Sequence, residues 1–117
     1  MISIDGSVQI YVATQPIDFR SGINRLMGLV THVLGHDGCS GAVFIFRNKR
    51  SNTIKLVRHD GSGAVLATKW LDRGKFYWPP VREGTMVLSG AQCTALLSGL
   101  DWSKLPTQAS VRPAFFG

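Results

Sequence analysis

Apolar residues recur along the chain with two different periods, and the changes of period divide it into elements. Residues 7–14 (SVQIYVAT) alternate in part and are rich in β-branched and aromatic types, which predicts a strand that Pro16 ends. A helix is expected from about residue 18 or 21 to 34, because apolar residues recur there every three or four positions. The expected apolar face of this helix comprises Ile23, Leu26, Met27, Val30, Val33 and Leu34.

The middle of the chain has the pattern of an antiparallel meander. Residues 42–46 (AVFIF) are apolar at every position, which predicts a central strand buried on both faces. Strands at 53–59 and 64–72 are expected next, joined by the turn DGSG. A tight turn at Arg73-Gly74 then leads into a short fourth strand at 75–78, which two prolines end.

Symmetric closure of these turns predicts one register for the meander. Lys55 lies opposite Thr68, Ile54 opposite Lys69, Trp70 opposite Tyr77, and Asp72 opposite Lys75. The face expected to form the core carries Ile54, Leu56, Val65, Ala67, Leu71, Phe76 and Trp78. The face expected to be half-exposed carries Lys55, Val57, His59, Leu66, Thr68, Trp70, Lys75 and Tyr77. A slip of one residue would exchange the two faces.

The C-terminal third predicts one more strand and one more helix. Residues 85–88 form a short strand or extended connector, and Ser89 caps a helix that runs to about Leu100. The fold class expected is α+β: one domain over residues 1–103, with a mainly antiparallel meander sheet of about five strands and two helices packed on one face. Residues 104–117 are expected to form a loosely structured tail, in which Phe115 and Phe116 are available for docking.

The charge of the protein is concentrated in one stretch. The formal net charge is +6, and residues 44–78 carry all of it, with eight basic residues, two acidic ones and six of the eleven aromatic residues. The remainder of the chain sums to zero. A basic balance of this kind favours acidic partners, with nucleic acid first, an anionic membrane surface second and an acidic protein third.

Composition narrows the class of protein further. No apolar run approaches the ~20 residues that span a bilayer, and the N-terminal residues do not have the pattern of a signal peptide. The two cysteines, Cys39 and Cys93, do not form a disulfide framework, so we expect reduced thiols in a cytoplasmic protein.

Catalytic and metal-binding patterns are weak. The spacing His32-x3-His36-x2-Cys39 would need a fourth zinc ligand from Cys93, His59 or an acid, and no CxxC pair supports it, so no metal or cofactor is expected. The seven carboxylates are scattered one by one, DGSG lacks the ending of a phosphate loop, and no nucleophile motif is present. We therefore expect a protein that is not an enzyme.

Nucleic-acid contact is the strongest chemical hypothesis. Phosphate contacts require exposed Lys and Arg, and stacking on unpaired bases requires exposed aromatic rings beside them. A soluble basic sheet with Trp70 and Tyr77 as a structural cross-strand pair is the alternative. The candidate nucleic-acid-binding residues are Arg47, Lys49, Arg50, Lys55, Arg58, Trp70, Arg73, Lys75 and Tyr77.

An ordered set of short motifs resembles one known family. The motifs are residues 18–23 (DFRSGI), 41–50 (GAVFIFRNKR), 54–57 (IKLV), 60–61 (DG) with Gly63, 74–79 (GKFYWP) and 96–102 (LLSGLDW). Together they resemble the TnpB-type accessory protein, the second open reading frame product, of the IS sixty-six family of bacterial insertion sequences, over roughly residues 1–103. The sequence departs from that pattern at Arg58-His59, where relatives usually place Tyr or Trp before the Asp, so charge replaces a stacking side chain there.

The resemblance implies a small accessory protein of DNA transposition, encoded beside a larger transposase that carries the catalytic acids. It supplies no catalytic residues to transfer. Two hypotheses follow: an accessory protein that contacts DNA, at element ends or without sequence preference, through the basic meander, or an adaptor that docks on the transposase without binding DNA itself.

Overall fold

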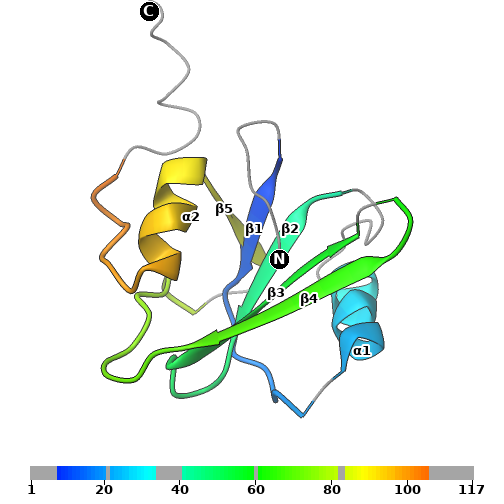
Figure 1. Cartoon of the computed structure of the whole chain (residues 1–117), viewed down its shortest axis with the longest axis horizontal. Coiled ribbons are helices and arrows are strands. Elements are labelled where there is room, and N and C mark those ends of the chain that lie inside the picture. The colour runs from blue at the N-terminus through cyan, green and yellow to red at the C-terminus, as the bar shows by residue number, and fades with distance from the viewer. Residues whose placement is uncertain (1–7, 21, 34–40, 60, 82–83, 106–117) are drawn as a thin grey trace, which may run out of the picture.

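The computed structural model describes residues 8–20, 22–33, 41–59, 61–81 and 84–105. Its centre is a five-stranded sheet in the order β4-β3-β2-β1-β5, accompanied by two helices (Figure 1). The elements are β1 (Ile10–Ala13), α1 (Ile23–Gly28) continuing as the π-helical turn η1 (Leu29–Val33), β2 (Val43–Arg47), β3 (Thr53–His59), β4 (Ala64–Trp70), β5 (Thr85–Leu88) and α2 (Gly90–Leu97). The predicted single α+β domain, with a mostly antiparallel five-stranded sheet and two helices, is confirmed.

The sheet combines a local meander with one parallel pair. β2, β3 and β4 run antiparallel in chain order, and the predicted pairing of Lys55 with Thr68 and of Ile54 with Lys69 is confirmed. β1 pairs parallel with β2, and β5 returns to pair antiparallel with β1 at the far edge. A parallel pair requires a crossover connection, and the segment that contains α1 and η1 supplies it.

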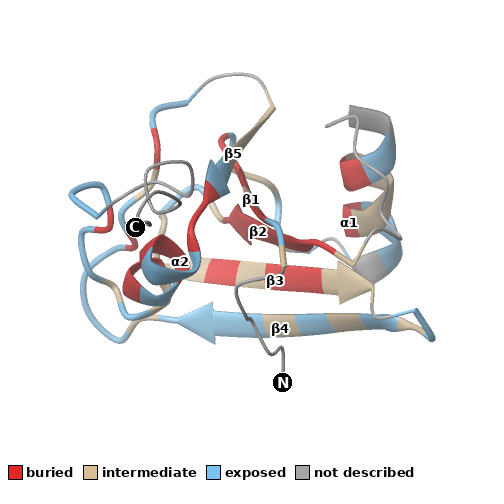
Figure 2. Ribbon diagram, turned by 90° about the horizontal axis from the view of Figure 1, so that it is seen from above, coloured by how far each residue is buried: buried red, intermediate tan, exposed pale blue. Residues whose placement is uncertain are grey.

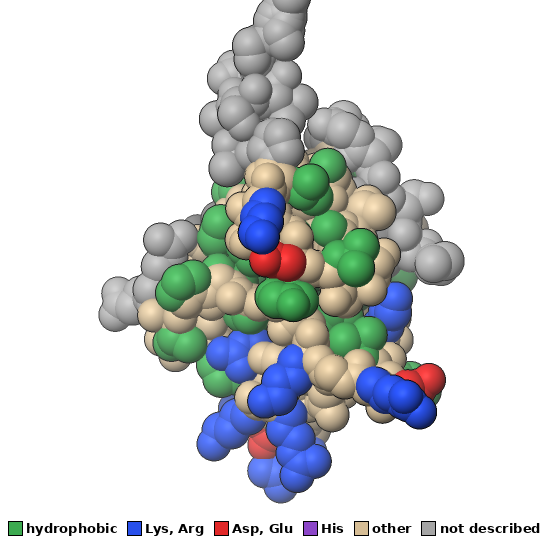
Figure 3. Space-filling view, turned by 90° about the vertical axis from the view of Figure 1, so that its left-hand side faces the viewer, with side chains coloured by type: hydrophobic (Ala, Val, Ile, Leu, Met, Phe, Trp, Pro, Cys, Tyr) green, Lys and Arg blue, Asp and Glu red, His purple; other side chains and the backbone are tan. Residues whose placement is uncertain are grey.

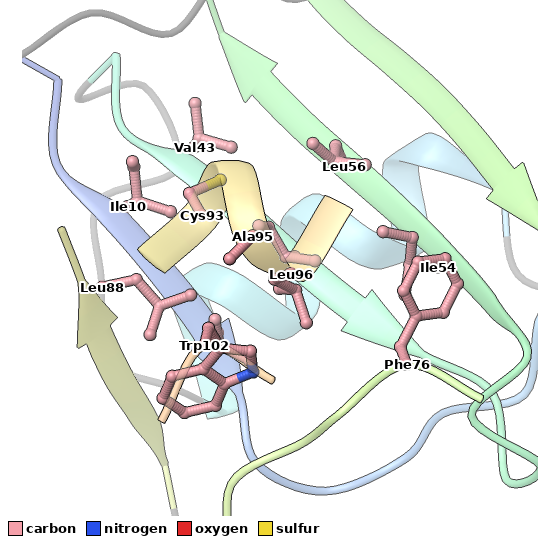
Figure 4. Packing of buried hydrophobic residues seen from close by; sticks show 12 residues of the cluster. Ile10, Val43, Ile54, Leu56, Phe76, Leu88, Cys93, Ala95, Leu96 and Trp102 are labelled. Carbon is pink, nitrogen blue, oxygen red and sulfur yellow. The ribbon is translucent and has the colours of Figure 1, made fainter. Parts of the chain in front are cut away.

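The two helices pack on opposite faces of the sheet, so the prediction that both pack on one face is wrong. Alternate residues of β1 and β2 contribute to two separate cores because successive side chains of a strand point to opposite faces. The α2 core holds Ile10, Val12, Val43, Ile45, Ile54, Leu56, Phe76, Leu88, Cys93, Ala95, Leu96 and Trp102 (Figure 4). The α1 core holds Ala13, Leu26, Val30, Ala42, Phe44, Phe46 and Val57. The burial of β2 on both faces, predicted from its apolar run, requires a cover on each side (Figure 2).

The predicted fourth meander strand at residues 75–78 is wrong, and with it the pairing of Trp70 with Tyr77 and of Asp72 with Lys75. Residues 72–81 are irregular. They cross the end of the sheet, because β4 lies at one edge and β5 at the other. Phe76 is buried in the α2 core, and the Trp78 indole N–H donates to the Ala13 carbonyl at 2.9 Å. Apolar side chains at 76 and 78 thus anchor a crossing segment instead of a strand.

Helix α2 has a strong signal at each end. Ser89 is the N-cap as predicted, and its hydroxyl accepts from the Gln92 N–H while the Gln92 side chain accepts from the Ser89 N–H. The helix ends earlier than predicted, at Leu97, because Gly99 takes a φ of +74° and the N–H of Leu100 bonds back to the Ala95 carbonyl. This turn brings Trp102 into the α2 core.

Two predictions fall on residues that lie outside the described ranges. They concern the tail after residue 105 with Phe115 and Phe116, and the His36 and Cys39 positions of the weak metal pattern. The domain boundary at residue 103 stays a prediction.

Candidate nucleic-acid interface

Two loops lie side by side at one end of the sheet. The first is the β2–β3 loop, residues 48–52, and the second is the turn that follows β4, residues 71–76. The Leu71 N–H donates to the Asn52 carbonyl at 2.9 Å, and the Phe76 N–H donates to the Ser51 carbonyl at 2.7 Å. Main-chain hydrogen bonds between residues 19 and 25 positions apart in sequence therefore hold the two loops together.

Four exposed cations project from these two loops. Lys49 and Arg50 belong to the first loop, and Arg73 and Lys75 to the second. We call these four residues the basic end. Figure 3 shows Lys and Arg side chains gathered at one extremity of the molecule, below a region with apolar side chains. The exposed Asp72 is the acidic residue of the second loop, so the charge of the two loops stays positive.

Arg47 is a buried residue of β2, although its candidate role requires exposure. Only 9% of its surface is exposed, and burial lowers the pKa of its guanidinium. Its Nη1 donates to the Asn48 and Lys49 carbonyls at 3.3 and 3.4 Å and to the Ser51 hydroxyl at 3.1 Å. The guanidinium carbon lies 6.0 Å from the centre of the Trp78 ring. In this geometry the Arg47 side chain stabilises the first loop, on which Lys49 and Arg50 are exposed.

Two further candidates are also engaged within the protein. Lys55 is half-buried, and its ammonium donates to the Phe19 carbonyl at 3.0 Å and lies 5.1 Å from the Phe19 ring centre. Arg58 is half-buried, and its Nε donates to the Gly41 carbonyl at 3.1 Å. Arg58 also sits near the other end of β3, about 17 Å from Thr53 at the usual rise per residue, so it does not join the basic end.

The two candidate aromatic residues are exposed and do not form the predicted cross-strand pair. Trp70, 65% exposed, ends β4 and shares its face with Lys55 and Val57, the face that α1 covers at its centre. Tyr77, 51% exposed, lines a groove with Arg73, Lys75 and Ser98. Trp70 precedes and Tyr77 follows the loop that carries Arg73 and Lys75, so each aromatic residue borders the basic end.

A second groove, which the sequence did not indicate, borders the basic end. It has a volume of about 590 Å³ and is lined by residues 16–19 and by residues of the first loop, including Lys49 and Arg50. The Ile17 N–H donates to the Arg47 carbonyl at 3.0 Å, and this bond joins the segment at residues 16–19 to the end of β2. The Arg20 guanidinium bonds Asp18 at 2.6 Å and lowers the pKa of that carboxyl to about 2. In the sequence, the motif at residues 18–23 is the one feature that overlaps the wall formed by residues 16–19.

Metal binding and thiol chemistry can be assessed on the described residues. Among them, no group of three or more His, Cys, Asp and Glu side chains is placed to hold a metal ion. Cys93 is buried in the α2 core, and burial raises the pKa of its thiol to about 11, which disfavours the reactive thiolate. No helix within the described ranges has the length and apolar character needed to cross a membrane.

Comparisons with known proteins converge on one family. Residues 8–107 match the family described as "IS66 Orf2 like protein". The uncharacterized protein y4jC of Sinorhizobium fredii is 42% identical over 113 residues, which cover 97% of each chain. The uncharacterized protein y4hO of the same organism is 38% identical over 102 residues, 87% of this chain and 89% of its own. No solved structure matches this chain.

Proposed function

This chain belongs to the family of IS66 Orf2 like proteins, and from that premise we propose that it is a non-catalytic accessory protein of insertion-sequence transposition that contacts DNA through its basic end. The observation that carries the proposal is the joining of two loops into one exposed group of four cations. Exposed Lys and Arg side chains on neighbouring loops are suited to phosphates, which supply most of the affinity of non-specific DNA binding.

The roles of the nine candidates differ under this proposal. Lys49, Arg50, Arg73 and Lys75 contact phosphates, and Trp70 is placed to stack on an unpaired base beside them. Arg47 positions the first loop from beneath. Lys55 and Arg58 stabilise the fold through the carbonyls that they bond. Tyr77 borders the contact, because it lines the groove that Arg73 and Lys75 also line.

A salt series in a DNA retardation assay tests the proposal. Four phosphate contacts predict a slope of log Kobs against log salt of about −3.6 on duplex DNA. The double variant Lys49→Ala/Arg50→Ala is expected to bring that slope to about −1.8. The matched control is Arg25→Ala/Lys104→Ala, which removes the same charge from exposed positions away from the basic end. Undetectable binding at low salt, or equal loss in both double variants, contradicts the proposal.

One observation favours a second candidate, the transposase adaptor. Large apolar side chains outside the strands and helices are exposed, among them Tyr77, Val81 and Leu100, at 51%, 62% and 59%. Figure 3 shows apolar side chains on the same face as the basic end. Nuclease-treated co-purification with the neighbouring transposase separates the two functions. Retention of the transposase without DNA, and its loss in Val81→Ser/Leu100→Ser, would favour the adaptor.

A further inference from the structure

β4 is an edge strand whose outer backbone groups face away from the sheet. Hydrogen-bonded pairs alternate along an antiparallel ladder. Because the Leu71 N–H donates to the Asn52 carbonyl, residues 71 and 52 form a hydrogen-bonded pair. The alternation then assigns Val65, Ala67 and Lys69 to the hydrogen-bonded pairs with β3. The N–H and C=O groups of the even-numbered residues therefore point outward. These residues are Ala64, Leu66, Thr68 and Trp70.

β4 has few of the usual protections of a sheet edge. Natural edges are short, or carry Pro, bulges or charged side chains, Lys above all. β4 spans seven residues without Pro, whereas β5 at the opposite edge has four. Its one charged residue, Lys69, points toward α2 and donates to the Leu97 carbonyl. Leu66 and Trp70, on the other face, are 38% and 65% exposed. Figure 2 shows β4 as an extended, largely exposed strand beside β3, whose residues are buried or intermediate.

We infer that β4 pairs antiparallel with β4 of a second copy of the chain, about a two-fold axis at Ala67. With the axis at Ala67, each of the seven residues of β4 lies opposite a residue of β4 in the second copy. The outward hydrogen-bonding groups of Ala64 meet those of Trp70 in the second copy. Those of Leu66 meet those of Thr68. Each large side chain on the shared face lies opposite a smaller one, and the two sheets become one sheet of ten strands.

The charges of the chain fit this pairing despite the net charge of +6. Lys69 lies opposite Val65 of the second copy, so no like charges face each other across the new ladder. The antiparallel arrangement also sends the two basic ends in opposite directions along the joined strands. Arg73 and Lys75 follow β4 directly, and they approach the turn before β4 in the second copy, where Gly61 and Ser62 are uncharged. The inference does not depend on DNA binding by the basic end.

Molar mass measured by light scattering across a concentration series tests the pairing. The mass is expected to rise toward twice the 12.8 kDa of one chain. Thr68→Pro removes an outward N–H and no bond to β3, and Leu66→Lys adds a charge at the edge, so both are expected to stay at the mass of one chain with an unchanged circular dichroism spectrum. The control Val81→Lys places the same charge on an exposed apolar site outside β4 and is expected to associate like the wild type.

A disulfide test fixes the axis. In Ala67→Cys the two position-67 residues form a closely spaced, non-hydrogen-bonded pair about 4.5 Å apart between Cα atoms, so oxidation is expected to link the copies. In the control Val65→Cys the equivalent residues are four positions out of register, beyond the ~7 Å limit for a bridge. A wild type of one-chain mass at every concentration, or equal cross-linking in both variants, overturns the inference. So does a Thr68→Pro variant that associates normally.

Discussion

Arg47 provides the sharpest test of how the basic end is built, because two roles predict opposite results for one substitution. Arg47→Met keeps the aliphatic stem and removes the guanidinium. If Arg47 holds the loop, three hydrogen bonds to Asn48, Lys49 and Ser51 are lost, with the contact to Trp78. If it binds phosphate, stability is untouched and affinity for DNA falls.

The magnitude follows from the geometry of the site. Bonds from a charged donor contribute about 1.5–3 kcal/mol each, but two of these are long, at 3.3 and 3.4 Å, and all come from one nitrogen. The Nε atom is buried without a hydrogen-bond partner, and the cost of burying it reduces the net stabilisation that the guanidinium contributes. We expect a net loss of about 2 kcal/mol from the free energy of unfolding. In a chain of this size that loss lowers Tm by roughly 8 °C.

The assay pairs thermal unfolding with the salt series. Arg50→Ala is the matched variant, because Arg50 is an exposed arginine of the same loop, and a change there is expected to stay within about 0.5 kcal/mol of the wild type. It should lower the steepness of the salt slope by about 0.9. The reasoning is refuted if Arg47→Met unfolds at the wild-type temperature and changes the salt slope as Arg50→Ala does.

Three further predictions concern stability and titration. Ser89→Ala removes the cap of α2 and is expected to cost about 1 kcal/mol in denaturant unfolding; an unchanged midpoint would contradict the capping role. The Asp18 carboxyl is expected to titrate near pH 2 by NMR, and Arg20→Gln should raise that midpoint toward the ordinary value of about 3.9. Because the folded-state pKa is lowered, the stabilisation from this pair is present above pH 4 and disappears as the pH falls through about 2; an unshifted midpoint in the variant would refute it. The Cys93 thiol, with its pKa raised to about 11, should be alkylated far more slowly in the folded protein than in denaturant at neutral pH, and equal rates by peptide mass mapping would show that it is not buried.

The sequence predicted the local parts of the fold well, because short-range pattern determines them. The period-two pattern of residues 53–59 and the DGSG turn set the β3–β4 register correctly. Ser89 with Gln92 three residues later marked the start of α2. The uniformly apolar run at β2 indicated burial on both faces. In each case the signal and the structure that it specifies lie within a few residues of each other.

The errors arose where long-range placement overrides local pattern. The alternation at residues 75–78 suits a strand equally well, but the chain has to travel from β4 to the opposite edge, and Phe76 and Trp78 serve that crossing. Arg47 was placed among the exposed cations because a basic run gives no sign of which member is buried. The wall at Ile17 and Asp18 meets the basic end only through the parallel β1–β2 pair, which no short-range pattern encodes.

The position of β1 between β2 and β5 has a consequence for the order of folding. Its neighbours are β2 and β5, and Ile10 pairs with Leu88, so nearly the whole described chain separates the two halves of that ladder. The β2–β3–β4 meander closes short loops and can form early, whereas the β1–β5 ladder must wait for a large loop-closure entropy to be overcome. During synthesis, β1 emerges first and its outer edge stays open until the residues of β5 have left the ribosome. Chains interrupted before residue 85 would therefore carry a second unprotected edge and are expected to be the species that aggregate.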